Sequence, residues 1–191
     1  MKVAYVAAGK TAWDGERRLQ GALDVPLCPD GSAAIRALVP ELSVLSAKVI
    51  YCDPGRTARE TADLLGDALH LRVRSRSELR APELGLWEGL LISDLRRKHP
   101  RGFRDWRGNP VDFPPPGGES GEGVLRRARE FVAFLRRKHG DHVVLVVCAR
   151  MVGQMLRSLL EGCDVRKYLG VRNSRSSDRW TVCDAEGAAV R

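Results

Sequence analysis

The chain has 191 residues, 43% of them hydrophobic, which is enough for one buried core, so we expect residues 1–191 to fold as a single domain. The formal net charge is +8, but the 32 lysines and arginines are spread along the whole sequence, which argues against a nucleic-acid ligand. The five cysteines lack paired spacing and no stretch reaches the about 20 apolar residues of a membrane helix, so we expect reduced thiols, a cytoplasmic location and no membrane contact.

Strands and helices alternate along the first part of the chain. Residues 3–6 form an apolar run that predicts a short buried strand, and residues 32–45 carry apolar side chains at helical spacing. A second strand is predicted over residues 48–51, a helix over 57–69 and a third strand near 71–73. This order is typical of a sheet whose strands are connected by helices.

The middle of the chain is less regular. Two short helices are predicted around residues 93–98 and 103–106, and residues 110–118 are expected to form a surface loop because proline and glycine dominate them. From Ser120 as far as Leu135 apolar residues recur at helical spacing, which predicts a long amphipathic helix.

The strongest strand signal lies toward the C-terminal end. Residues 143–147 form an apolar, mainly β-branched run that is too continuous to face water on either side, so we expect a central parallel strand there. A helix over residues 152–160 and a closing strand over 180–183 complete the pattern. We therefore expect a three-layer α/β/α fold with a mostly parallel, doubly wound sheet.

In such a sheet the functional site lies at the carboxyl ends of the strands. In this chain those ends are residues 7–9, residues 52–53 and residues 148–150. We expect these three corners to converge on one site.

The first of these corners carries most of a known motif. Gly9, Thr11 and Trp13 follow the first strand, and segments 18–21 and 23–27 come after them. Together these residues resemble the opening of the histidine phosphatase, or phosphoglycerate mutase-like, superfamily, whose signature is Arg-His-Gly-Glu-Thr-x-Trp-Asn. The resemblance covers nearly the whole chain and implies a phosphoglycerate mutase-like fold.

The resemblance also locates the reactive positions of the family, and in this chain other residues hold them. The family is understood to use a phosphohistidine nucleophile, cationic groups on the phosphoryl oxygens, a second histidine and an acid. The five positions are occupied here by Ala7, Ala8, Thr57, Ala81 and Ala149. Four of these side chains are a single methyl group, which can neither attack phosphorus nor transfer a proton.

Basic residues near the same corners could still bind an anion. The resemblance places Arg18 in a pocket motif, while Lys10, Thr11, Arg56 and Arg150 lie beside the substituted positions. Solvated surface charge accounts for these residues equally well. We treat the five as candidate anion-binding residues, and we expect no metal site and no cofactor.

The substituted positions predict a catalytically inactive member of the superfamily, a pseudophosphatase that acts as a binding, scaffolding or regulatory subunit. The expected partners are a protein of unknown identity and a phosphorylated or anionic small ligand held without turnover, and a homodimer is left open. The alternative is a phosphomonoesterase or mutase-like enzyme of altered mechanism. It would use Cys148, Asp53, Glu83 or Glu88 together with the basic residues.

The tripeptide Gly9-Lys10-Thr11 after a strand invites comparison with the phosphate-binding G-x-x-x-x-G-K-[ST] loop. The first glycine of that motif falls on Ala4, inside the predicted strand. The loop is therefore too short to wrap a phosphate, and nucleotide hydrolysis is not expected.

Overall fold

The computed structural model of the chain describes residues 1–166, 169 and 180–184. Its five strands form one sheet in the order β3-β2-β4-β1-β5. Their bounds are β1 Lys2–Ala7, β2 Ile50–Cys52, β3 Val73–Ser75, β4 Val143–Cys148 and β5 Trp180–Asp184. The first four strands are parallel, and β5 runs antiparallel to β1. The expected mostly parallel sheet with a central strand at β4 is confirmed.

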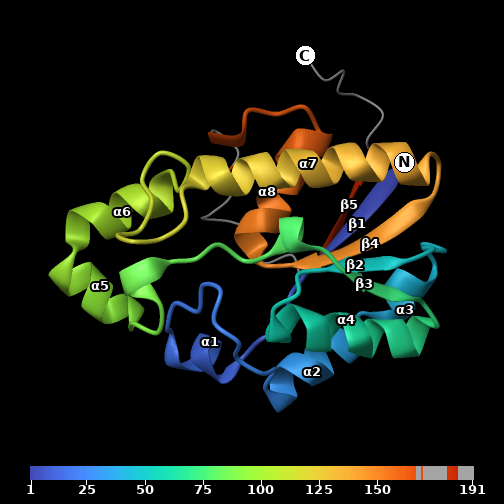
Figure 1. Cartoon of the computed structure of the whole chain (residues 1–191). Coiled ribbons are helices and arrows are strands. Elements are labelled where there is room, and N and C mark those ends of the chain that lie inside the picture. The colour runs from blue at the N-terminus through green and yellow to red at the C-terminus, as the bar shows by residue number, and fades with distance from the viewer. Residues whose placement is uncertain (167–168, 170–179, 185–191) are drawn as a thin grey trace.

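Helices cover both faces of this sheet (Figure 1). The helices of one face are α2 Pro29–Arg36, α3 Val39–Ser43 and α4 Arg56–Leu69, and those of the other face are α7 Gly121–His139 and α8 Arg150–Leu160. The doubly wound, three-layer arrangement is confirmed.

A third group of helices stands beyond the carboxyl ends of the strands, to the left of the sheet in Figure 1. It consists of α1 Ala12–Glu16, α5 Ile92–Lys98 and α6 Pro100–Gly108. Two 3₁₀ turns, Ser77–Leu79 and Gly85–Trp87, lie on the connection that leads from β3 to α5. This group encloses the end of the sheet where the site was expected.

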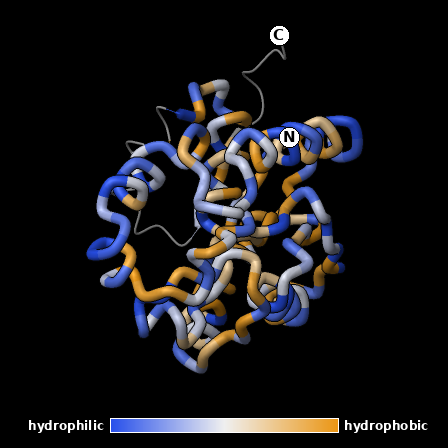
Figure 2. The backbone as a smooth tube through the Cα atoms, turned by 60° about the vertical axis from the view of Figure 1, so that its left-hand side comes forward, coloured by the Kyte–Doolittle hydropathy of each residue, from blue (hydrophilic) through white to orange (hydrophobic). Residues whose placement is uncertain are grey.

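The sequence of the central strand β4 shows no alternation of apolar and polar residues, because helices cover both faces of the strand. Val144 and Val146 pack into the core under α7 and α8, while Leu145 and Val147 pack into the core over α4. Every one of these side chains is buried, because a parallel strand between two helical layers has no face toward water. Hydrophobic positions accordingly follow the strands through the middle of the molecule in Figure 2, and hydrophilic positions dominate the outer helices.

The segment predicted as one helix over residues 32–45 forms two short helices instead, so that prediction is wrong. The first helix starts earlier, at Pro29, because the Cys28 sulfur accepts the Gly31 N–H at 3.3 Å and caps it. The second contains Pro40 in its first turn. Proline has no N–H to donate to the preceding turn, so it suits a new helix start and ends the earlier helix.

Helix α1 was not predicted from the sequence. It begins after Thr11, whose N–H donates to Asp14 Oδ2 at 2.8 Å and whose hydroxyl donates to the same oxygen at 3.1 Å. With only five residues it is too short to show an apolar period.

Two predictions from the sequence concern membrane-crossing helices and disulfide bonds. Within the described ranges, no helix has both the length and the apolar run of a membrane-crossing segment. The five cysteines all lie in the described part, and none of them forms a disulfide.

The packing of α8 on β1 depends on the absence of a side chain at Gly153. A methyl group there would overlap the buried ring of Tyr5. We expect Gly153→Ala to lower the free energy of unfolding by about 1–3 kcal/mol, the usual cost of overpacking a core, measured by urea denaturation.

The matched control is Gly15→Ala in α1, where an added methyl group meets no atom within 4 Å. That variant should be neutral or more stable by about 0.4–1 kcal/mol, because it lowers the entropy of the unfolded chain. Equal effects of the two substitutions would contradict the proposed contact between α8 and β1.

Candidate functional site

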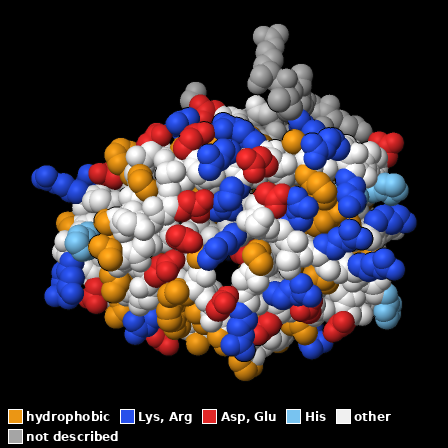
Figure 3. Space-filling model, viewed as in Figure 1, with side chains coloured by type: hydrophobic (Ala, Val, Ile, Leu, Met, Phe, Trp, Pro, Cys, Tyr) orange, Lys and Arg blue, Asp and Glu red, His pale blue; other side chains and the backbone are white. Residues whose placement is uncertain are grey.

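A cavity of about 950 Å³ lies at the carboxyl ends of β1, β2 and β4. Residues 7–11, 53–58 and 149–151 all line it, so the three corners meet as predicted. Backbone pairing continues past the strands, because the Ala8 N–H donates to the Cys148 carbonyl at 3.1 Å. The surface is hollowed near the middle of the face shown in Figure 3, between basic and acidic side chains.

All five reactive positions implied by the resemblance line this cavity. They are Ala7, Ala8, Thr57, Ala81 and Ala149. The structure therefore brings the substituted positions together, as the family register requires. None of the four histidines, which all lie in the described part, is among the lining residues.

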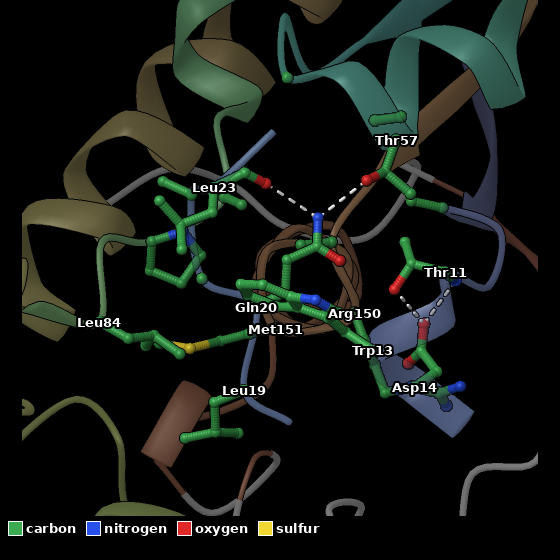
Figure 4. A pocket seen from close by; sticks show the side chains of 18 of the residues that line it. Thr11, Trp13, Asp14, Leu19, Gln20, Leu23, Thr57, Leu84, Arg150 and Met151 are labelled. Carbon is green, nitrogen blue, oxygen red and sulfur yellow. Dashed lines mark hydrogen bonds between the residues drawn. The ribbon is translucent and has the colours of Figure 1, made fainter. Parts of the chain in front are cut away.

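Thr57 is held by its neighbours instead of pointing freely into the cavity. Its hydroxyl donates to the Val25 carbonyl at 2.5 Å and accepts from Gln20 Nε2 at 2.8 Å. The same Gln20 nitrogen donates to the Leu23 carbonyl at 3.0 Å, as the dashed lines of Figure 4 show. Thr57 thus fixes the loop between α1 and α2.

The five candidate anion-binding residues also line the cavity. Arg18 Nη1 donates to the Gly89 carbonyl at 2.9 Å, and Arg56 Nε donates to Glu60 at 2.7 Å. Thr11 differs from the rest, because its hydroxyl already donates to Asp14 and its side chain is buried. Figure 4 places Arg150 beside Gln20, in the middle of the cavity.

More cations surround the cavity than the sequence indicated. The eight described basic lining residues are Lys10, Arg17, Arg18, Arg56, Arg80, Arg96, Arg107 and Arg150, and the three acidic ones are Asp14, Asp24 and Asp53. The sequence analysis missed Arg17, Arg80, Arg96 and Arg107. Two of these, Arg96 and Arg107, come from α5 and α6. Basic residues are common near the C-terminal ends of helices, so the sequence gives no sign that these two reach the cavity.

Asp53 is the acidic residue of this set that is buried, with 4% of its surface exposed. Its Oδ1 accepts the Gly55 N–H at 2.8 Å and its Oδ2 accepts the Ala81 N–H at 2.9 Å. Burial raises the pKa of Asp53 above its usual 3.8, although these two N–H groups and nearby arginines oppose the rise. The carboxylate is thus a stronger base than an exposed aspartate.

Arg127 positions the backbone that holds Asp53. Its Nη1 donates to the carbonyls of Glu78 at 2.9 Å and of Arg80 at 3.0 Å. Its other nitrogens bind both carboxylate oxygens of Glu119, at 2.9 and 2.7 Å. This half-buried pair fixes the turn that directs the Ala81 N–H at Asp53.

The other residues of the predicted alternative mechanism are less suitable. Cys148 is fully buried, is not among the lining residues, and burial raises the pKa of its thiol, so the nucleophilic thiolate is disfavoured. Glu83 is 58% exposed and pairs with Arg80, outside the lining set. Glu88 uses Oε1 to accept the N–H groups of Ala22 and Leu84, which is a structural role.

The profile of the histidine phosphatase superfamily (branch 1) matches residues 6–190. Phosphoserine phosphatase 1 of Hydrogenobacter thermophilus is 29% identical over 168 residues, which cover 88% of this chain and 80% of that protein. Glucosyl-3-phosphoglycerate phosphatase of Mycobacterium tuberculosis is 33% identical over 134 residues, covering 70% of this chain and 60% of that protein.

The likeness extends to the fold. The solved structure of a mycobacterial glucosyl-3-phosphoglycerate phosphatase superposes with a TM-score of 0.83 at 26% identity, covering 95% of this chain and 88% of the other. A structure of Bacillus stearothermophilus YhfR gives a TM-score of 0.79 at 27% identity, covering 87% of this chain and 83% of the other.

These findings correct the expectation of a pseudophosphatase that acts only as a binding, scaffolding or regulatory subunit. The two relatives and the mycobacterial structural neighbour have the names of phosphatases, which favours an enzyme. The expectation gave decisive weight to five substituted positions and too little to the retained framework around them.

Because the pKa of Asp53 is raised in the folded state, folding should bind a proton between pH 3.8 and the folded pKa. The carboxyl's contribution to the free energy of unfolding should therefore decrease as pH rises through that window and stay constant above it. Urea denaturation of the wild-type chain and of Asp53→Asn from pH 4 upward measures it as their difference. A difference that is constant, or that grows with pH, would contradict the burial of this carboxyl.

Proposed function

Since the chain belongs to the histidine phosphatase superfamily (branch 1), we propose that it is a phosphomonoesterase that works without a phosphohistidine. One observation carries the proposal: a buried carboxylate, Asp53, lines a cavity whose described charged residues are eight basic and three acidic. The phosphatase names of the relatives support hydrolysis of a phosphate monoester.

The strand ends supply the phosphate site. Helix α4 and helix α8 both begin at the cavity. At the start of α4 the Gly55 and Arg56 N–H groups already donate to Asp53 and Asp24, whereas the N-cap residue of α8, Ala149, provides no side-chain cap. The N-terminal ends of helices favour anions through their backbone N–H groups and their dipoles. Arg56 and Arg150 are the first residues of these two helices, and Arg18, in the loop after α1, lines the same cavity. A dianionic phosphoryl group is the ligand that this arrangement favours.

Asp53 supplies the base. In the proposed reaction a water molecule attacks phosphorus and gives a proton to the Asp53 carboxylate. A bond forms between phosphorus and the water oxygen while the bond between phosphorus and the alcohol oxygen breaks. The alcohol leaves as an alkoxide that takes a proton from solvent, Asp53 releases the proton it accepted to solvent, and inorganic phosphate is the other product. The raised pKa of Asp53 suits this role, because a base is most efficient near the working pH.

The cationic groups supply the remaining catalysis. Phosphoryl transfer depends mainly on positioning and on charge stabilisation of the equatorial oxygens, which arginines can provide. Ala8 and Ala149 leave room for the attacking water where the family has imidazole groups. A protein partner, a homodimer and a cytoplasmic location remain predictions from the sequence, whereas the anionic ligand is now expected to be turned over.

Hydrolysis of p-nitrophenyl phosphate in the presence of a chelator tests the proposal. The wild-type chain should release phosphate, and Asp53→Asn should lower kcat by about 10²- to 10⁴-fold, the usual contribution of a general base. The control is Asp63→Asn, since Asp63 is half exposed on α4, pairs with Arg59 and does not line the cavity. This control should keep the wild-type rate.

Two results would overturn the proposal. The first is a wild-type rate equal to that of buffer. The second is a rate that Asp53→Asn and Asp63→Asn leave equally unchanged, which would indicate a contaminating phosphatase or another base.

The acid position of the family holds Ala81, which cannot protonate a leaving alkoxide. The rate should therefore depend steeply on the leaving group. Across aryl phosphates whose phenols span about three pKa units, kcat/KM should fall by at least about tenfold per unit of rising phenol pKa, because charge builds on the leaving oxygen. A rate independent of the phenol pKa would contradict the absence of a general acid.

A further inference from the structure

We infer that the alcohol part of the substrate is bulky and apolar and carries an aromatic ring. The inference rests on the proposed phosphomonoesterase function and assigns the other half of the same cavity. The phosphoryl group takes the cationic end at the strands, and the ring takes an apolar wall on the opposite side.

The cavity is divided by side-chain chemistry. The apolar wall consists of Leu19, Leu23, Leu84, Phe103, Trp106 and Met151. In Figure 4 the aliphatic members of this wall lie on one side of the view, and Thr11, Asp14 and Thr57 lie on the other. Gln20 and Arg150 stand between the two sides. Arg107 also lines the cavity, and its guanidinium carbon lies 5.9 Å from the centroid of the Phe103 ring, so a ligand that reaches the apolar wall meets a cation beside the apolar groups.

The aromatic part of the wall is rigid. Trp106 packs edge-on against Trp87, with ring centroids 5.7 Å apart, and Phe103 packs against the same Trp87 at 6.0 Å. Trp87 is buried and does not line the cavity, so it supports the two lining rings from behind. Because these rings are fixed before any ligand arrives, binding costs little side-chain entropy. Flat, preformed aromatic surfaces favour an aromatic ligand through offset or edge-on packing.

The size of the cavity also points to a bulky alcohol. About 950 Å³ lies at the upper end of the usual 300–1,000 Å³ for sites that bind drug-sized ligands. A phosphoryl group with a short polar alcohol would fill only the cationic end and leave the accessible part of the apolar wall, such as Leu23, in contact with water, whereas Leu84 and Phe103 are already buried. A ring-bearing alcohol removes that apolar surface from water, which is favourable.

Leu23 gives an independent indication. Its side chain is 42% exposed and lines the cavity, and its carbonyl accepts from the same Gln20 amide that donates to Thr57. A bound apolar group would cover it. Leu86, by comparison, is 76% exposed and does not line the cavity.

Calorimetric titration with two phosphonates tests the inference without requiring turnover. Methylphosphonate probes the cationic end alone, and 1-naphthylmethylphosphonate probes both ends. The naphthyl compound should bind about 30- to 100-fold more tightly, the effect of burying roughly 100 Å² of apolar surface.

Variants then locate the ring. Trp106→Ala should weaken 1-naphthylmethylphosphonate about tenfold or more and leave methylphosphonate unchanged. Because that variant removes part of a packed cluster, Leu23→Gln serves as the second variant; its side chain is already 42% exposed, so folding is preserved. It should weaken the naphthyl compound about three- to tenfold. Leu86→Gln is the matched control and should change neither affinity.

The outcomes test the apolar subsite and the proposed phosphomonoesterase function separately. Equal affinity of the two phosphonates, or a naphthyl preference that Leu23→Gln and Leu86→Gln affect equally, would overturn the apolar subsite and leave the proposed phosphomonoesterase standing. Failure of both phosphonates to bind would overturn the proposed function and with it the inference. A naphthyl preference that Leu23→Gln reduces and Leu86→Gln does not would support the inference.

Discussion

The parallel pairing of β2, β4 and β1 is the constraint on which the rest of the structure depends. The pairing sets Ala7 opposite Cys148 and Cys52 opposite Val147, so the three loops that follow these strands start at the same edge of the sheet. Only apolar side chains can occupy such a strand on both faces, which explains the composition of β4. Because each crossover returns through a helix, the starts of α4 and α8 come to the same edge and add their N-terminal dipoles to it.

At that edge of the sheet, opposing effects set the pKa of one buried carboxyl, that of Asp53. Asp53 is desolvated, which favours its protonated form, while two backbone N–H groups favour the ionised form. The second of these N–H groups, from Ala81, belongs to a turn that Arg127 fixes through two carbonyls and Glu119. The base of the proposed reaction is thus tuned by a residue of α7 that does not line the cavity. No histidine is among the residues that line the cavity, so the proposed reaction depends on the Asp53 carboxyl and on the surrounding cations.

The sequence predicts the parts of the molecule that depend on local pattern. Strand and helix periods located every strand of the sheet to within a few residues, and the rule for parallel sheets predicted that Ala8, Asp53 and Ala149 would meet. It could not predict the break at Pro40 within a continuous apolar period, nor the cap made by Cys28. Phe103 and Trp106 of the apolar wall come from α6, and Arg96 and Arg107 come from α5 and α6; these helices reach the cavity only through tertiary packing. The expectation of inactivity was wrong because residue identity at a few positions does not describe the charge and burial of a folded site.

The central claim is that this cavity binds a phosphoryl group beside Asp53. A crystal structure of the chain with orthovanadate, whose five-coordinate form mimics the phosphoryl-transfer geometry, tests it most directly. The account predicts vanadium at the strand ends, equatorial oxygens bound by Arg18 or Arg150, and an apical oxygen within hydrogen-bond distance of the Asp53 carboxylate. Vanadate bound elsewhere, or bound in the cavity with its apical oxygen away from Asp53, would contradict it.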